Sequence, residues 1–230
     1  MAKIISVEEA IDMIPDGASI MIGGFMGCGN PHKLVDALAK SGKGNFTLFC
    51  NDGAMPVGPC GEEYYGVAKL IHNKQIKKMY ATHVGLNPEI AEQSNSGELE
   101  LILTPQGSYV EMIRAGGAGL GAVITPTGVG TIVEDYEHVI GRMEIEGKTY
   151  LIERPYRADF ALIAGYKIDK AGNIWYKGTT RCFSVAMATA ADIVIAEADN
   201  LVEIGEIEPE DVVTQGVYVK YIVEGGIENG

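Results

Sequence analysis

Basic residues are scarce in this sequence. Lysine and arginine together number 18, against 31 aspartates and glutamates, which gives a formal net charge of −13. A protein that binds nucleic acid through its phosphates needs a basic stripe to release counterions, and this sequence contains none. The composition therefore argues against a nucleic-acid partner, although a few local donors can hold a phosphate or carboxylate group on an acidic protein.

Cysteine and histidine are sparse as well. The four cysteines are Cys28, Cys50, Cys60 and Cys182, and the four histidines are His32, His72, His83 and His138. Neither set has the close spacing of metal ligands, so we expect no metal site. Few cysteines, without a signal-peptide pattern, lead us to expect a cytoplasmic protein.

Long hydrophobic runs are missing too. No apolar stretch approaches the ~20 residues that cross a bilayer, so we expect no membrane span. Hydrophobic residues nevertheless make up 47% of the 230-residue chain, which is enough to bury a substantial core. Because no linker-like segment or fixed-period repeat divides the chain, we expect a single domain over residues 1–230.

Short apolar runs alternate with helical patterns along the chain. Strands are predicted at residues 18–22, 46–50, 78–82, 99–103, 122–124, 160–164 and 193–196. Helices are predicted behind the Ser6/Glu9 capping box, between an N-cap at Asn30 and a stop at Gly42, and at residues 64–71, 88–93, 109–114 and 184–190. This alternation predicts an α/β fold whose open, mostly parallel sheet carries helices on both faces.

Two segments depart from the alternation. Residues 136–151 have the pattern of a small β-hairpin that leaves the sheet. An apolar run at residues 217–223 predicts a strand that needs a sheet edge or a partner to cover it.

A glycine-rich stretch separates the strand at residues 18–22 from the helix that follows. It reads Gly23-Gly24-Phe25-Met26-Gly27-Cys28-Gly29. The backbone N–H groups of a strand–loop–helix unit can bind an anion, but this stretch has neither the register of G-x-G-x-x-G nor the Gly-Lys-Ser/Thr of a nucleotide loop. Tight packing of strand against helix explains the glycines at least as well. An exposed phenylalanine is costly, so we expect Phe25 to wall a pocket or meet a partner.

A second glycine-rich region spans residues 114–131. Its glycines include Gly116, Gly117, Gly119, Gly128 and Gly130. Two such regions exceed what turns usually require. We therefore expect loops here whose backbone lies close to a ligand or to another chain.

Amide side chains follow two of the predicted strands. Asn51 comes directly after residues 46–50, and Gln106 follows residues 99–103. Ligands bind at the carboxyl ends of strands in open sheets, and a neutral amide can donate to a carboxylate or to a developing oxyanion. Turn capping is the alternative for each residue alone, but their joint placement favours a site.

The order of these motifs resembles the alpha subunits of family I coenzyme A transferases. The matching segments are residues 16–31, 51–52, 104–108, 113–119, 125–131, 153–155 and 157–159. These segments are spread over residues 16–159, so the resemblance extends over most of the chain. Their pattern is most similar to alpha subunits of the acetate, butyrate and acetoacetate type.

The resemblance implies an enzyme that exchanges short-chain carboxylates on coenzyme A by a ping-pong route. The intermediate would be a glutamyl-CoA thioester on a glutamate of the partner beta subunit, with acyl-CoA and a carboxylate as substrates and no permanently bound cofactor. Carried over by motif, Gln106 and Asn51 would lie beside the nucleophile, and the Gly24-Phe25 turn would face substrate or partner. Related chains can carry asparagine in place of Asp52, and an anion there would repel a substrate carboxylate unless it points away.

Other interpretations of the sequence stay open. A dinucleotide-binding module needs an acidic residue after the second strand, which Asp52 could supply. A sugar-phosphate isomerase-like subunit would need a carboxylate base and phosphate-binding cations, which the glycine-rich stretches lack. The terminal Glu228-Asn229-Gly230 resembles the segment around the family's beta-subunit nucleophile, but no glycine-rich loop follows it, and we interpret the match as chance.

Overall fold

A parallel β-sheet forms the centre of the protein. The structure, a computed structural model, describes residues 1–225. The strands of the main sheet are β1 (Lys3–Ile5), β2 (Ser19–Ile22), β3 (Phe46–Phe49), β6 (Ile76–Ala81), β7 (Glu100–Leu103), β11 (Ala158–Asp169), β12 (Ile174–Trp175), β13 (Ala191–Val202) and β14 (Tyr221–Glu224). Their order is β1-β14-β13-β11-β2-β3-β6-β7, with parallel neighbours, and β12 runs antiparallel beside β11.

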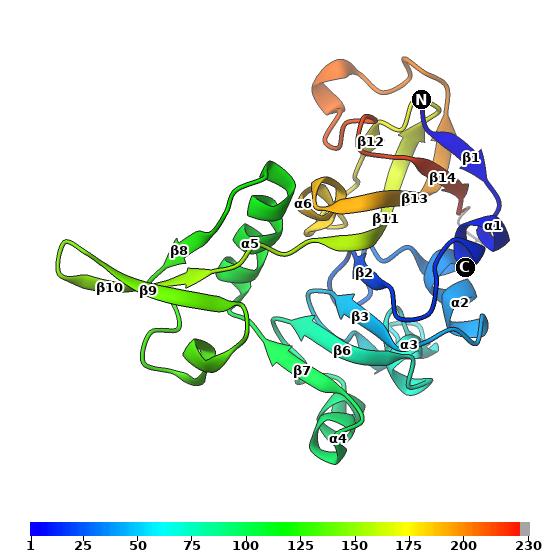
Figure 1. Ribbon diagram of the computed structural model, residues 1–230. Helices are drawn as coiled ribbons and strands as arrows, with labels where there is room; N and C mark the ends of the chain where they lie inside the picture. The colour runs from blue at the N-terminus through cyan, green and yellow to red at the C-terminus, as the bar shows by residue number, and fades with distance from the viewer. Residues whose placement is uncertain (226–230) are drawn as a thin grey trace.

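Helices cover both faces of this sheet (Figure 1). One face carries α1 (Val7–Asp12), α2 (His32–Lys40), α3 (Ala68–His72) and α4 (Pro88–Ser96), and the other carries α5 (Gln106–Ala118) and α6 (Ser184–Thr189). Side chains alternate between the two cores along β2, where Ile20 and Ile22 face the α1–α4 layer and Met21 faces α5 and α6. A strand covered on both faces is apolar throughout, which explains the unbroken apolar runs. The predicted α/β fold with a mostly parallel sheet is confirmed.

A smaller sheet stands beside α5 (Figure 1). It contains β8 (Val123–Thr125), β9 (Val139–Ile145) and β10 (Lys148–Glu153) in the antiparallel order β8-β10-β9. The hairpin predicted at residues 136–151 is therefore present as β9 and β10. The strand predicted at residues 122–124 belongs to this small sheet and not to the main one.

The remaining elements are short. A two-stranded ribbon consists of β4 (Met55–Val57) and β5 (Glu63–Tyr65), and two 3-10 helices are η1 (Ile132–Asp135) and η2 (Pro209–Asp211). None of the helices in the described part of the chain is long and apolar enough to traverse a lipid bilayer.

Two predicted helix starts are wrong. Pro31, not Asn30, is the N-cap of α2, because the Asn30 amide is engaged elsewhere, donating to the Gly23 carbonyl and accepting from the Val67 N–H. Residues 64–71 do not form one helix. Tyr64, with a φ of 52°, lies in β5, and α3 begins only at Ala68, because a left-handed residue cannot belong to a right-handed helix.

The glycines of α5 correct a further prediction. Gly116 and Gly117, expected in a loop, lie inside α5, which ends at a left-handed Gly119 with a φ of 70°. A Cβ on Gly117 would lie 1.9 Å from Thr189 Oγ1 of α6, and one on Gly116 would lie 2.0 Å from the Tyr156 carbonyl oxygen. Their close neighbours thus belong to the same chain. This close packing offsets the low helix propensity of glycine, which costs about 1 kcal/mol per residue relative to alanine.

The predicted strand at residues 217–223 begins only at Tyr221. It forms β14, which pairs with β13 on one side and with β1 on the other. The sheet itself therefore covers this segment, and β1, which is too short to show a periodic pattern, becomes the edge strand.

Candidate active site

Successive strands are added to the sheet on opposite sides of β2. It first adds β3, β6 and β7 on one side of β2, and later adds β11, β13 and β14 on the other. The connection after β2 leads to α2 on one face, whereas the connection after β12 leads to α6 on the opposite face. Connections that diverge in this way open a crevice at the carboxyl ends of the strands, where open α/β sheets bind ligands.

A pocket of about 130 Å³ is lined by residues from these connections. The lining residues are Phe25, Asn51, Gln106, Cys182 and Phe183. Phe25 follows β2, Asn51 follows β3, and Gln106 is the first residue of α5. The structure thus brings together the three side chains that sequence analysis selected. Cys182 and Phe183, directly before α6, were missed because no glycine or amide pattern marks them.

The two amides of the pocket are held by hydrogen bonds. Gln106 Nε2 donates to Asn51 Oδ1 over 2.9 Å, and Thr82 Oγ1 donates to the same oxygen over 2.9 Å. A side-chain amide has two N–H groups, and among the described residues the second N–H of Gln106 has no acceptor. Gln106 can therefore donate to a ligand from a fixed position.

Asp52 is not a free anion at this pocket. Its Oδ1 accepts from the Ala54 N–H over 2.7 Å, and its Oδ2 accepts from the Met26 N–H over 2.9 Å. Both oxygens are engaged in fastening the glycine-rich loop to the turn after β3. The repulsion of a substrate carboxylate is therefore reduced, and Asp52 is only 5% exposed, which does not favour the contact with a ribose hydroxyl that a dinucleotide-binding module requires.

The glycine-rich loop after β2 folds back on itself. Phe25 and Cys28 exchange two backbone hydrogen bonds of 2.9 Å, and the Phe25 side chain is 42% exposed. Gly24, with a φ of 112°, has a conformation that favours glycine. A Cβ on Gly23, Gly27 or Gly29 would clash with Ser184, Tyr65 or Thr180 respectively. Tight packing therefore accounts for these loop glycines.

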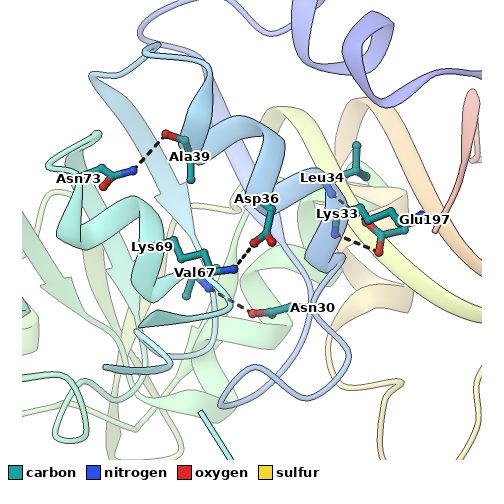
Figure 2. Close-up of polar contacts among 9 residues, drawn as sticks. All are labelled: Asn30, Lys33, Leu34, Asp36, Ala39, Val67, Lys69, Asn73 and Glu197. Carbon is teal, nitrogen blue, oxygen red and sulfur yellow. Dashed lines mark hydrogen bonds and ion pairs between the residues drawn. The ribbon is translucent and has the colours of Figure 1, made fainter. Parts of the chain in front are cut away.

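The N-terminus of α2 is closed by a carboxylate of the chain itself (Figure 2). Glu197 on β13 accepts from the Lys33 N–H over 3.2 Å and from the Leu34 N–H over 2.9 Å. Burial raises the pKa of Glu197 to about 7, although these two N–H groups oppose the shift. A phosphate at this helix N-terminus would have to displace Glu197, so the geometry does not support a phosphate-binding loop or the dinucleotide-binding alternative.

Contacts from α3 hold α2 on its other side. Figure 2 shows the ion pair between Lys69 and Asp36, and the hydrogen bond of 3.0 Å from Asn73 Nδ2 to the Ala39 carbonyl. The loop that carries Phe25 therefore ends on a helix that is anchored from both directions.

The pocket contains no activated nucleophile among residues 1–225. Burial raises the pKa of the Cys182 thiol, and Cys28 and Asp52 raise it further, so Cys182 is a neutral thiol and a weak nucleophile. No carboxylate, lysine or arginine of residues 1–225 lines the pocket, so the described part of the chain does not supply the base and cations of a sugar-phosphate isomerase there. Within the described residues, no three His, Cys, Asp or Glu side chains gather closely enough to hold a metal ion.

Two of the larger hollows, of about 390 and 290 Å³, lie over α3 and its neighbouring helices. Their ionisable side chains pair with one another, as His72 Nδ1 does with Glu89 Oε1 at 3.1 Å and Lys74 Nζ with Glu98 Oε2 at 2.8 Å. Exposed pairs of this kind are typical of a solvated surface. We therefore place the candidate site at the smaller pocket.

Two predicted glycines lie outside this pocket. Gly128 and Gly130 precede η1 beside the small sheet and are not lining residues, and Glu228 lies outside the described residues.

Comparison with known proteins identifies the family. A family model described as coenzyme A transferase matches residues 4–225. The acetate CoA-transferase subunit alpha of Escherichia coli strain K12 is 43% identical, over 96% of this chain and 96% of that protein. The acetoacetyl-CoA:acetate/butyrate CoA transferase alpha subunit of Clostridium acetobutylicum is 45% identical, over 97% of this chain and 98% of that protein.

Solved structures share the fold. Glutaconate coenzyme A-transferase from Acidaminococcus fermentans aligns with a TM-score of 0.82 over 97% of this chain and 75% of that chain, at 17% identity. The order of motifs, the full-length similarity and the fold agree. The chain therefore belongs to the coenzyme A transferase family.

Proposed function

We propose that this chain is the alpha subunit of a heteromeric short-chain acyl-CoA:carboxylate CoA-transferase of the acetate, butyrate and acetoacetate class. The observation that carries the proposal is a pocket with two oriented neutral amides and, among residues 1–225, no activated nucleophile. The names of the relatives from Escherichia coli and Clostridium acetobutylicum support the substrate class. Coenzyme A is then a substrate, and the proposal includes no permanently bound cofactor.

The proposed reaction places negative charge on oxygen at each step. A glutamate of the beta subunit attacks the acyl-CoA carbonyl and expels the CoA thiolate, which leaves a mixed glutamyl–acyl anhydride. The thiolate then attacks the glutamyl carbonyl, so that the glutamyl-CoA thioester forms and the first carboxylate is released. A second carboxylate attacks this thioester, and the same two steps in reverse pass coenzyme A to it and free the glutamate. Neutral donors suit such a site, because they stabilise an oxyanion without binding either carboxylate too tightly. We assign this role to the second N–H of Gln106. Asn51 would orient the Gln106 side chain by accepting its first N–H.

The partner of the chain follows from the same assignment. We propose that the beta subunit supplies the nucleophile opposite Gln106, and that the exposed ring of Phe25 meets the substrate or this subunit. We further propose that residues 1–230 act as one domain. The proposed compartment is the cytoplasm, since all four cysteines are free thiols.

A reconstitution experiment tests the proposal. The purified chain alone should not transfer coenzyme A from acetoacetyl-CoA to acetate, and adding the purified beta subunit should restore transfer. Borohydride trapping of the thioester should modify only the beta chain. Turnover by the chain alone, or a modified carboxylate in it such as Glu228, would overturn the assignment.

A further inference from the structure

Asp52 follows the pocket residue Asn51 in the chain, and its side chain is buried. Its carboxylate accepts hydrogen bonds from three donors. Oδ1 accepts from the Ala54 N–H over 2.7 Å, whereas Oδ2 accepts from the Met26 N–H over 2.9 Å and from Asn51 Nδ2 over 3.3 Å. One oxygen of Asp52 therefore contacts both the glycine-rich loop and an amide of the pocket.

The two backbone donors have an unusual conformation. Met26 and Ala54 have φ values of 51° and 52°, in the left-handed region that residues with a side chain rarely adopt. Backbone strain of this kind persists only where the surrounding structure imposes it, and it concentrates at functional sites. Because the N–H groups of both strained residues donate to Asp52, its carboxylate is fixed between the loop after β2 and the turn after β3.

The position of this carboxylate determines which way the Asn51 amide is turned. A carboxylate can only accept hydrogen bonds, so Asn51 must direct Nδ2 toward Asp52. Its Oδ1 is then left to accept from Gln106 Nε2 and from Thr82 Oγ1, each over 2.9 Å. The reversed amide would place Oδ1 against the carboxylate and Nδ2 against two donors. Only the observed orientation satisfies all of these groups.

The orientation of Gln106 follows in turn. Since Asn51 presents an oxygen, Gln106 must present Nε2 and not Oε1 to it. The second N–H on the same nitrogen has no acceptor among residues 1–225 and is the proposed oxyanion donor. An unbroken series of hydrogen bonds thus runs from this donor through Asn51 to Asp52.

We propose that Asp52 is a positioning residue for Gln106. It acts through Asn51, whose amide it turns so that Gln106 presents an N–H, and not an oxygen, to the reacting group. The inference rests on the proposed function, because Gln106 must serve the transferase reaction.

Two substitutions separate this role from a purely local one. Asp52→Ser keeps a hydroxyl that can accept from the N–H two residues later, at Ala54, but is too short to replace Oδ2. Asp52→Asn keeps one oxygen, which we expect at the place of Oδ2 because two donors meet there, and loses the bond to Ala54. A residue that only stabilised the turn would tolerate serine better than asparagine, whereas a positioning residue would show the reverse.

The kinetics of each variant are measured after assembly with the beta subunit. We expect Asp52→Ser to lower kcat about 10-fold, equivalent to about 1.4 kcal/mol, with KM changed less than about twofold. Asp52→Asn should stay within about twofold of the natural kcat. In the Gln106→Ala background, Asp52→Ser should lower kcat less than about twofold, because residues that act through one another are not additive.

Asp169 offers a matched control at a distance from the pocket. It is also a buried carboxylate that accepts from two backbone N–H groups and an asparagine amide, namely those of Ala171 and Asn173 and Asn173 Nδ2, each over 2.9 Å. Asp169→Ser should change kcat less than about twofold, and equally with and without Gln106.

Three results would overturn the inference: an unchanged kcat in Asp52→Ser, an equal effect of Asp52→Ser in both backgrounds, or a larger loss in Asp52→Asn than in Asp52→Ser. If Asp52→Ser does not assemble, Asp52→Asn decides, and a 10-fold loss of kcat in it would contradict the role of Oδ2. Failure of the proposed function looks different: the natural assembly would then transfer no coenzyme A, or Gln106→Ala would react at the full rate.

Discussion

At the residue scale, the pocket depends on neutral donors held in place. Gln106 and Asn51 are linked by one hydrogen bond of 2.9 Å, and Asp52 is occupied by two backbone N–H groups. A lysine or arginine at the position of Gln106 would bind carboxylates more strongly in the ground state, which gains nothing for the chemical step. The neutrality of the lining side chains thus fits a site that binds one carboxylate after another.

Replacement of Gln106 by alanine tests this view. The Gln106→Ala subunit, assembled with the beta subunit, should lower kcat by about 10- to 1000-fold, the scale expected for the loss of one oxyanion donor. Steady-state kinetics measure the effect. Gln93→Ala is the control, because Gln93 is a glutamine away from the pocket whose side chain donates to the Ile71 carbonyl in α3. An unchanged kcat in Gln106→Ala would remove Gln106 from the site.

At the element scale, α5 shows why sequence patterns misplace glycines. Local propensity assigns Gly116 and Gly117 to a loop, whereas the structure keeps them in a helix that packs closely against Tyr156 and α6. Tyr64 and Asn30 were also misassigned, because β5 pairs with β4 and the Asn30 side chain bonds to the Gly23 carbonyl and the Val67 N–H. The presence of β2, β3, β6 and β7 and the mostly parallel sheet, by contrast, follow from local patterns and were predicted.

Alanine substitutions at two glycines of α5 test how closely this helix packs on α6. Gly117→Ala should destabilise the chain by about 1–3 kcal/mol, because the new Cβ would lie 1.9 Å from Thr189 Oγ1 and within 3 Å of the Thr189 backbone. Gly107→Ala meets nothing within 4 Å, and it should be neutral or stabilising by up to about 1 kcal/mol. Urea unfolding compares the two, and equal effects would refute the close contact.

At the scale of the whole molecule, the fold and part of the site could be predicted from sequence. The α/β sheet was predicted, and the structure places Phe25, Asn51 and Gln106 around one pocket. Cys182 and Phe183 could not be found, because only the return of the chain through β11 and β12 brings them opposite Phe25. The Glu197 cap on α2 and the burial of Glu153 at the end of β10 likewise depend on long-range contacts.

Two buried carboxyl groups link the stability of the whole molecule to pH. Burial raises the pKa of Glu153 and of Glu197 to about 7, from an ordinary value near 4.5. The folded chain then binds these protons more tightly than the unfolded chain does. The contribution of each group to the stability of the fold is therefore lost as the pH rises from about 4.5 to about 7. His138 acts in the opposite sense: burial lowers its pKa to about 4, so its contribution is lost as the pH falls from about 6.5 to about 4.

The pH ranges over which Glu153, Glu197 and His138 titrate overlap. The contribution of Glu153 is therefore isolated by comparing the free energy of unfolding of a variant with that of the natural chain at each pH. Glu153→Gln cannot ionise, and its free energy of unfolding should rise relative to the natural chain by about 2 kcal/mol between pH 5.5 and pH 8.5. Urea unfolding of both chains at several pH values in this range measures the difference. A difference that does not change with pH would show that Glu153 keeps the same protonation state in the folded and unfolded chain. Its burial at the end of β10 would then have no part in the pH dependence of stability.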